Sequence, residues 1–440
     1  MATSNVSEDS AGTGMAKAST CKCLTVRRNL VVCIDGTSNQ FGPHNTNVVE
    51  LYNQIVKGQT VKGEQLTYYD SGIGTVARSS WRSPGTTMKQ WIDTKLDLIL
   101  ALNIEKIILR AYQWLSNHFQ EDDATADQIY LFGFSRGAYQ VRALAGMIET
   151  VGLLLPGNDA QIPFAYELYA NLRGIKPDAW KINFKSTFSR KHARVHFLGA
   201  WDTVAAVGFH HKTLPRVVGP CDHICTVRHA LALDERRAAF LHLPINVVSP
   251  TSTESLIPTT PSPYEVHIKE VWFAGTHSEV GGGSRLNVDL NSGNISLTWM
   301  RQEAQLAGLR ISTPDLRLRG VDLEGVPEKS LKGKWRFLQL LLVGRPQRQI
   351  QSGQKIHFSV CFKEAPYKPT VTLPEPQSSL LTELQPLKWA DMRSSASSVV
   401  KLSDNDWEKG IFDPQTATIM LEYLRSENSR SLMCRMRRRH

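Results

Sequence analysis

The chain has 440 residues, of which 41% are hydrophobic and 21% are charged, and its formal net charge is +10. This composition is typical of a globular protein with a large core, and it excludes a disordered chain. No apolar run is long enough to cross a membrane. Seven cysteines, an odd number scattered along the chain, indicate reduced thiols, so we expect a cytoplasmic protein.

The two ends of the chain differ in composition from the middle. Residues 1–27 begin with a stretch rich in Ser, Ala, Thr and Gly that has no apolar segment, so we expect a flexible lead-in and no secretory signal. Residues 435–440 carry four arginines and a histidine. Such a cluster attracts anionic lipid or nucleic acid, although a solvated basic tail is the simpler interpretation. We expect no nucleic-acid partner, and peripheral contact with a membrane stays open.

Apolar runs alternate with helical patterns through the first 310 residues. Predicted strands lie at 30–34, 66–69, 129–132, 195–201 and 264–274. Predicted helices lie at 45–56, 86–99, 104–119, 138–147, 227–240 and 297–309. This alternation predicts βαβ units and therefore an α/β fold, with a mainly parallel sheet flanked by helices.

The strongest motif lies where a strand meets a helix. The apolar run 129–132 leads into Gly133-Phe-Ser135-Arg-Gly137, and a helical pattern follows. A Gly-x-Ser-x-Gly turn between a strand and a helix is typical of a nucleophile elbow. The turn strains the serine backbone, and a side chain at either glycine would collide with a neighbouring element. We therefore predict Ser135 as a nucleophile; the alternative is a turn that only packs a helix on a strand.

Two further polar side chains also follow predicted strands. Asp202 comes after 195–201, and His277 comes after 264–274 and before three consecutive glycines. The order Ser, Asp, His is the order of the α/β-hydrolase triad. Histidine would take the serine proton, and the carboxylate would hold the imidazole in one tautomer. The weaker alternatives are an Asp202 that only caps its segment, an ordinary loop His277, and the rivals Asp222, Asp234, His210, His211 and His267.

A serine hydrolase also needs donors for the oxyanion of the tetrahedral intermediate. We nominate the backbone N–H of Arg136, with Gly36 or Thr37 in the loop after 30–34 as the second donor. Asp35 and Asp70 each end a predicted strand. Asp35 either shapes the oxyanion loop, holds the surroundings of the triad, binds a cation with a neighbouring carboxylate, or forms a buried turn.

Two metal-based alternatives come from the same region of sequence. Residues 221–225 contain two cysteines and a histidine, with His229 nearby, but their spacing departs from the Cys-x-x-Cys pairs of zinc sites. A metal-dependent phosphoesterase built on Asp35, Asp70 and Asp202 is a second alternative. We nevertheless expect no metal and no cofactor.

In these motifs the chain resembles the α/β-hydrolase family that contains the class-one phospholipase effectors of bacterial type VI secretion, with many fungal and bacterial relatives of unassigned function. The resemblance covers roughly 30–309 and rests on the segments 35–37 with 45–48, 69–74, 133–138, 201–204, 229–237 and 275–283. It implies a Ser135–Asp202–His277 triad and ester hydrolysis; phospholipid is the substrate of the secreted effectors. Glu279 stands where the family often has Asp.

We therefore predict an α/β-hydrolase domain over 28–310, with cap-like insertions at about 154–192 and 209–263, and a C-terminal extension over 311–440 that ends in the basic tail. The predicted activity is a serine esterase or lipase that works through an acyl-enzyme, with a small-molecule or lipid ester as substrate. A non-catalytic binding module with the hydrolase fold is the remaining alternative.

Overall fold

A computed structural model describes most of the first 312 residues and parts of the remainder. The described residues are 25–36, 42–60, 63–72, 92–171, 177–204, 214–217, 224–237, 240–245, 267–287, 294–312, 327–328, 330–331, 348–351, 353–357, 359–360, 363, 367–371 and 411–412. Residues 335–342, whose pattern also predicts a helix, lie outside them, as do the basic cluster at 435–440 and nearly all of the lead-in 1–27.

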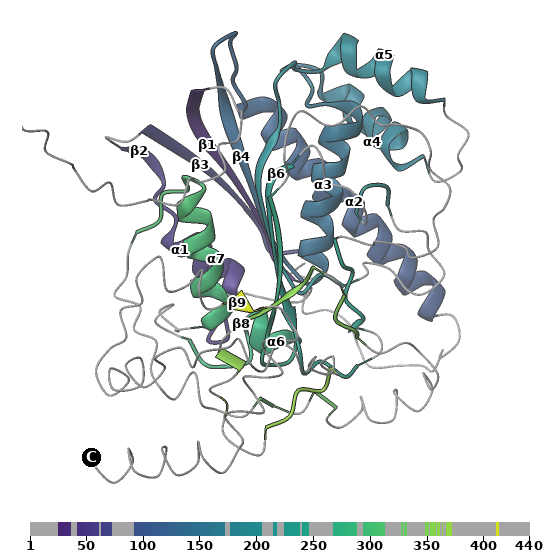
Figure 1. Cartoon of the computed structure of the whole chain (residues 1–440). Coiled ribbons are helices and arrows are strands. Elements are labelled where there is room, and N and C mark those ends of the chain that lie inside the picture. Colours follow the sequence, from purple (N-terminus) through teal and green to yellow (C-terminus); the bar gives the residue numbers. More distant parts are fainter. Residues whose placement is uncertain are drawn as a thin grey trace, which may run out of the picture.

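The described strands form one sheet, with the order β2-β3-β1-β4-β5-β6-β7-β8-β9 (Figure 1). The strands are β1 Thr25–Ile34, β2 Gly58–Thr60, β3 Gly63–Asp70, β4 Thr125–Phe134, β5 Val195–Trp201, β6 Ile224–Ala232, β7 His267–Phe273, β8 Lys355–His357 and β9 Ile411–Phe412. All neighbours from β3 to β8 pair in parallel, and only β2 and β9 are antiparallel. The predicted α/β fold with a mainly parallel sheet is confirmed.

Helices cover both faces of the sheet (Figure 1). They are α1 Asn47–Gln54, α2 Ile92–His118, α3 Arg136–Val151, α4 Ile162–Ala170, α5 Asp178–Phe188, α6 His277–Val280 and α7 Ile295–Leu306. The helices α2, α3, α4 and α5 lie on one face, α1 and α7 lie on the other, and α6 lies at one edge. Within the described residues, none of these helices has both the length and the apolar character to cross a membrane.

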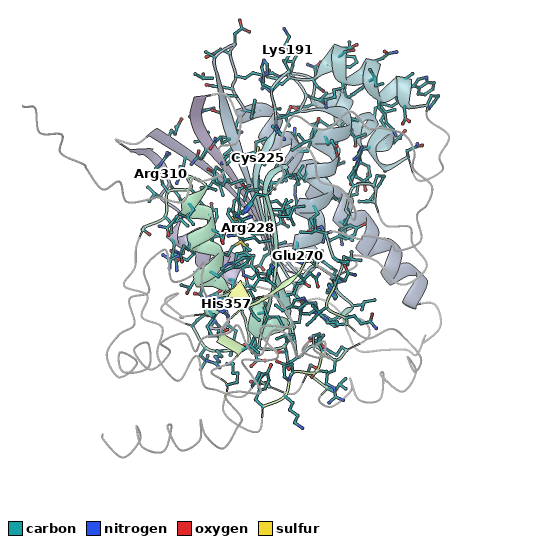
Figure 2. All side chains as sticks on the ribbon, in the orientation of Figure 1. Lys191, Cys225, Arg228, Glu270, Arg310 and His357 are labelled. Atoms are coloured by element: carbon teal, nitrogen blue, oxygen red, sulfur yellow. The ribbon has the colours of Figure 1, made fainter. Side chains whose placement is uncertain are left out.

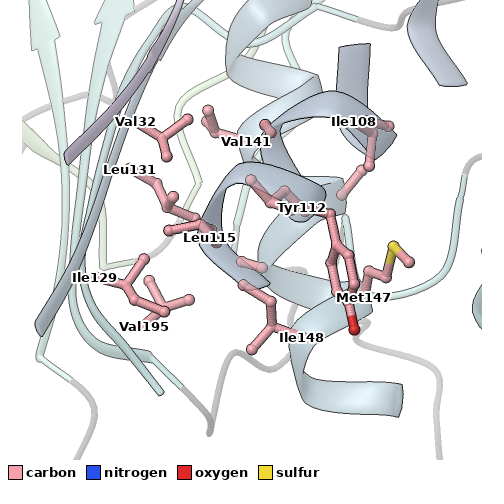
Figure 3. Packing of buried hydrophobic residues seen from close by; sticks show 14 of the residues in the cluster. Val32, Ile108, Tyr112, Leu115, Ile129, Leu131, Val141, Met147, Ile148 and Val195 are labelled. Carbon is pink, nitrogen blue, oxygen red and sulfur yellow. The ribbon is translucent and has the colours of Figure 1, made fainter. Parts of the chain in front are cut away.

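The alternation of side chains along β1 divides the core into two halves. Leu30, Val32 and Ile34 belong to the cluster beneath α2 and α3, whereas Val31 and Cys33 belong to the cluster beneath α1 and α7. Figure 3 shows the first half, where side chains of the sheet meet those of the helices. Because both faces of the second half of β1 are buried, residues 30–34 form a continuous apolar run and do not alternate with polar residues.

The direction of chain winding changes at β1. Its sheet neighbours are β3 on one side and β4 on the other, so the connections that follow these strands diverge at their carboxyl ends. Open α/β sheets bind ligands in the crevice at such a switch point. Asp35 follows β1 and Ser135 follows β4, so both residues lie at this crevice.

The helix predicted at 227–240 is wrong, because Ile224–Ala232 is β6, an interior strand of the sheet. The polar residues Arg228 and His229 within this strand gave its sequence the pattern of a helix. Arg228 is buried in an ion pair with Glu303, and His229 is buried against Glu270; Figure 2 labels Arg228 and Glu270 in the middle of the molecule. The helices predicted separately at 86–99 and 104–119 meet in the single helix α2.

The segment 154–192 does not cover the carboxyl edge of the sheet. Helices α4 and α5 lie at the opposite end of the molecule from α6 (Figure 1). The guanidinium of Arg190 donates to the Ser116 carbonyl at 2.8 Å, and the backbone N–H of Lys191 donates to the Glu121 carboxylate at 3.0 Å. Both acceptors lie shortly before the start of β4. The segment therefore packs beside the amino ends of the strands.

Candidate active site

The turn between β4 and α3 has strained backbone geometry at Ser135. Its φ is 59° and its ψ is −121°, values that a residue other than glycine rarely adopts. A Cβ atom at Gly133 would lie 2.5 Å from the Gly137 carbonyl oxygen, and one at Gly137 would lie 2.3 Å from the Ile34 carbonyl oxygen. Only glycines therefore allow a turn this tight, which presents the serine side chain at the start of α3.

The register of β4 against β5 brings Asp202 beside Ser135. Phe134 is the register partner of Trp201, and the Ser135 N–H donates to the Trp201 carbonyl at 2.9 Å. The N–H of Asp202 continues the ladder by donating to the Ala230 carbonyl at 2.7 Å. Two side chains that are distant in sequence thus meet because they follow paired strands.

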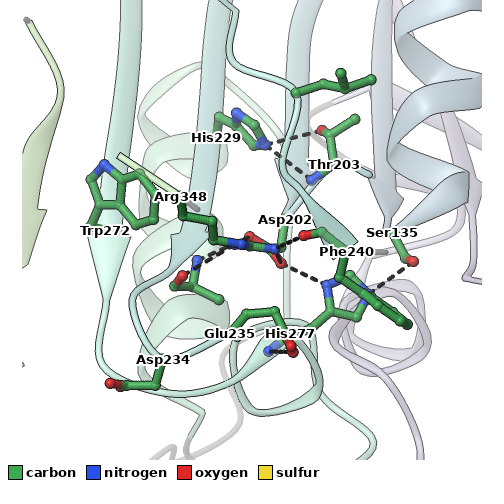
Figure 4. Close-up of polar contacts among 12 residues, drawn as sticks. Ser135, Asp202, Thr203, His229, Asp234, Glu235, Phe240, Trp272, His277 and Arg348 are labelled. Atoms are coloured by element: carbon green, nitrogen blue, oxygen red, sulfur yellow. Dashed lines mark hydrogen bonds and ion pairs between the residues drawn. The ribbon is translucent and has the colours of Figure 1, made fainter. Parts of the chain in front are cut away.

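The side chains of Ser135, His277 and Asp202 form a hydrogen-bonded row (Figure 4). The distance from Ser135 Oγ to His277 Nε2 is 2.9 Å, and that from His277 Nδ1 to Asp202 Oδ2 is 2.6 Å. A carboxylate only accepts, so Nδ1 carries the proton and Nε2 accepts from the serine hydroxyl. All three residues are buried. This is the arrangement in which histidine takes a proton from serine.

Two aromatic rings enclose the imidazole. The Phe134 and Phe240 ring centres lie 4.6 Å and 4.9 Å from that of His277. Burial lowers the pKa of His277 below its ordinary value, although its hydrogen bond to Asp202 acts in the opposite direction. At neutral pH the imidazole is therefore uncharged, which is the form that a general base requires.

The Asp202 carboxylate is fully buried and receives several donors. Arg348 Nη1 donates to Oδ1 at 2.6 Å and Nη2 donates to Oδ2 at 2.8 Å, while the Ala232 N–H donates to Oδ1 at 3.0 Å. Burial alone would raise the pKa of Asp202, but the charge of Arg348 and the hydrogen bonds from His277 and Arg348 lower it well below its usual range. Asp202 is therefore ionised at neutral pH.

Asp35 fastens the loop that follows β1. Its buried carboxylate accepts from the Thr46 hydroxyl at 2.9 Å, from the Tyr69 hydroxyl at 3.1 Å and from the Gly36 N–H at 2.6 Å. These bonds match the structural roles considered for Asp35. Because the Gly36 N–H already donates to this carboxylate, it is a less suitable oxyanion donor, and Thr37 lies outside the described residues.

Asp70 makes its contacts away from Ser135, His277 and Asp202. Its carboxylate pairs with Arg110 at 2.6 Å and accepts from the Tyr68 hydroxyl at 3.1 Å. The third nominated carboxylate, Asp202, is saturated by other donors. Within the described part of the chain, no group of three His, Cys, Asp or Glu side chains is arranged to hold a metal ion.

His229, a ligand of the predicted zinc alternative, already has protein partners. His229 Nδ1 contacts Glu270 at 2.9 Å, while Nε2 accepts from the Thr203 N–H at 3.2 Å. Both ring nitrogens are therefore used by protein partners. Cys225 is buried in β6, and residues 221–223 lie outside the described residues.

The rival triad residues have other positions or partners. Asp234 accepts from the Gly275 N–H and the Tyr367 hydroxyl, both at 2.8 Å, so it fastens the loop before His277. His267 lies at the first position of β7, at the opposite end of that strand from His277. Asp222, His210 and His211 lie outside the described residues.

Three neighbours of the row were missed from the sequence. Arg348 holds Asp202, Phe240 contacts the imidazole ring, and the Glu235 carboxylate accepts from the His277 N–H at 3.3 Å. Glu235 lies inside the segment 229–237 that carries the resemblance, which was the one available signal. Arg348 follows neither a predicted strand nor a motif, so only the fold reveals it.

An α/β sheet with serine, histidine and aspartate in one hydrogen-bonded row at its carboxyl edge is the architecture that α/β-hydrolases use. Residues 28–303, well over half of the chain, match the family described as "T6SS, Phospholipase effector Tle1-like, catalytic domain". The chain therefore belongs to the Tle1-like phospholipase effector family.

Individual relatives either have lower sequence identity to this chain or match only part of it. The chain is 35% identical over 226 residues to the uncharacterized protein YEL023C of Saccharomyces cerevisiae, a match that covers 49% of this chain and 32% of the yeast protein. An uncharacterized Pseudomonas aeruginosa structure has 20% identity and a TM-score of 0.37, covering 68% of this chain and 48% of that one. The Tle1 effector bound to the VgrG spike has 17% identity and a TM-score of 0.31, covering 63% and 56%. At such TM-scores we infer nothing from these two structures.

Proposed function

We propose that this chain hydrolyses lipid esters, with phospholipid as the substrate class, through Ser135, His277 and Asp202. The observation that carries the proposal is the unbroken row of hydrogen bonds from Ser135 Oγ through the imidazole to the Asp202 carboxylate. Membership of a phospholipase effector family favours a lipid ester over a small soluble ester.

In the proposed reaction, Ser135 Oγ attacks the ester carbonyl carbon while its proton moves to His277 Nε2. Asp202 stabilises the imidazolium through Nδ1–H, and the backbone N–H of Arg136 donates to the oxyanion. The imidazolium then protonates the leaving alcohol as the carbon–oxygen ester bond breaks. Water, deprotonated by the same nitrogen, releases the carboxylic acid from the acyl-enzyme.

The test compares wild type with Ser135→Ala on p-nitrophenyl esters of graded chain length and on phosphatidylcholine and phosphatidylethanolamine vesicles. We expect the substitution to lower kcat by a factor on the order of 10³ or more on every substrate. Ser186→Ala is the matched control, because Ser186 is an exposed serine of α5 at the far end of the molecule. Hydrolysis that survives Ser135→Ala would refute the proposal.

Two competing functions have their own tests. A metal-dependent phosphoesterase would lose activity on treatment with EDTA and would retain it in Ser135→Ala. The existing bonds of Asp35, Asp70 and Asp202 to protein donors disfavour it. A non-catalytic binding module would leave Ser135 unlabelled by a fluorophosphonate probe that modifies activated serines, whereas we expect labelling.

A further inference from the structure

Arg348 makes a two-pronged ion pair with the carboxylate behind the imidazole (Figure 4). Its Nη1 and Nη2 lie 2.6 Å and 2.8 Å from the two oxygens of Asp202. Its remaining contacts are backbone carbonyls: Nη1 donates to Ala232 at 3.1 Å and Nη2 donates to Phe240. Both charged side chains are buried. The fork fixes the plane of the carboxylate, because two parallel hydrogen bonds leave it no freedom to rotate.

Arg348 lies beyond the region that defines the family, which ends at residue 303. Its segment is nevertheless fastened to the sheet. The Gln351 N–H donates to Gln354 Oε1 at 2.9 Å, and Trp272 of β7 donates to the same oxygen at 2.8 Å. Just after Gln354, β8 pairs in parallel with β7. The part of the chain after the family region therefore delivers a charged group to the row through ordered structure.

We propose that Arg348 is a positioning residue of the active site: it holds the Asp202 carboxylate in the orientation that His277 needs, and it places a buried positive charge directly behind that carboxylate. This inference rests on the proposed function.

The charges around His277 define the direction of the effect. The carboxylates that face the imidazole or lie just behind it are Asp202, Glu235 and Asp234, and the cations are Arg348 and Arg237, which pairs with Glu235 and lies over the Phe240 ring. The other groups are the hydroxyl of Ser135, the rings of Phe134 and Phe240, the buried His242 and the His229–Glu270 pair. Burial lowers the pKa of His277, Asp202 and Glu235 raise it, and Arg348 lowers it. Removing the cation therefore raises the pKa of the imidazole.

The experiment measures kcat/KM against pH for the full chain on a short-chain p-nitrophenyl ester. In Arg348→Met, we expect the acidic limb to move to higher pH by about one unit, the size that loss of one nearby charge gives. In Arg348→Lys, the charge remains but the fork is lost, so we expect the limb to stay in place and kcat to fall about tenfold, with KM little changed.

Arg228→Met is the matched control. Arg228 is also buried and pairs with Glu303, and its contacts include the Val227 and His267 carbonyls. It lies in the middle of β6, whereas His277 lies beyond the carboxyl end of the neighbouring strand β7. We expect this variant to lose stability and to keep the wild-type pH profile.

A profile of Arg348→Met that coincides with that of wild type, or an equal shift in Arg228→Met, would overturn the inference. If Arg348→Met does not fold, Arg348→Lys decides, since wild-type kcat in that variant would also overturn it. Failure of both variants to fold would assign Arg348 a structural role instead. Activity that persists in Ser135→Ala would refute the proposed function itself, whatever the Arg348 variants do.

Discussion

Gly281 leaves room for the ring that packs on the imidazole. It directly follows α6, and a Cβ atom there would lie 1.9 Å from Cε2 and 2.2 Å from Cδ2 of Phe134. The Phe134 ring centre is in turn 4.6 Å from that of His277. The φ of Gly281 is −88°, which any residue can adopt, so alanine would act through this contact alone. Gly281→Ala therefore tests how strictly the imidazole is positioned.

The expected magnitudes follow from overpacking and from misplacement. An added methyl group in a filled space costs about 1–3 kcal/mol of unfolding free energy. Since either the Phe134 ring or the turn at Gly281 must move, the imidazole moves too, and a displacement of about 1 Å lowers kcat by about 10²-fold. The measurements are urea unfolding and kcat on a p-nitrophenyl ester.

Gly199→Ala separates these two effects. A Cβ atom at Gly199 would lie 2.7 Å from Phe132 Cδ1 and 2.8 Å from Met300 Sδ, in the core behind β5 and away from the imidazole. We expect a similar loss of stability with little change in kcat. If Gly281→Ala keeps wild-type kcat while losing as much stability as Gly199→Ala, the imidazole does not depend on the packing of Phe134.

Three further predictions concern stability and the far end of the molecule. Burial lowers the pKa of His242 and of His357 to about 3. Because the unfolded chain takes up protons at these histidines near pH 6.5, acidification from pH 7 to 5.5 should cost about 2.5 kcal/mol in urea unfolding, and an unchanged midpoint would contradict this. Asp35→Asn replaces one acceptor oxygen of the carboxylate with an NH2 donor, which then faces hydroxyl donors such as those of Thr46 and Tyr69; it should lose about 1–3 kcal/mol by the same assay, together with hydrolysis. Trp180→Ser, at an exposed position of α5, should leave kcat unchanged; a large loss would indicate that α5 influences the site after all.

The positions of the buried strands, and of the polar residues that follow them, could be predicted from where apolar runs begin and end. The runs at 30–34, 129–132 and 195–201 lie in strands buried on both faces, and a polar residue of the site region follows each of them directly or within a few residues. Parallel strands place their carboxyl ends at one edge, so residues after such strands can be expected to meet. Periodicity failed at β6, where Arg228 points into a buried ion pair and His229 into a buried hydrogen bond with Glu270, so that the strand has the polar content of a helix surface.

Other features could not be predicted because local pattern does not fix position in space. The segment 154–192 was predicted as a cap-like insertion, and nothing in its composition indicated that α4 and α5 pack beside the amino ends of the strands. Three consecutive glycines, 281–283, come shortly after His277, and a sequence of this kind is compatible with close backbone approach to a ligand. In the structure, Gly281 accommodates Phe134, and a Cβ atom at Gly282 would lie 2.5 Å from the Asn47 backbone nitrogen. These glycines therefore allow α6 to pack against its neighbours.

The basicity of the proposed general base depends on charges from distant parts of the chain. Asp202 follows β5, Glu235 follows β6, and Arg348 lies 146 residues beyond Asp202. Burial and the arginine lower the pKa of His277, and the two carboxylates raise it. Because these effects oppose one another, the aspartate can orient the imidazole strongly without making it so basic that it is protonated at neutral pH. A motif can specify the three residues of the row, but the protonation state in which the row works depends on the segment after the family region.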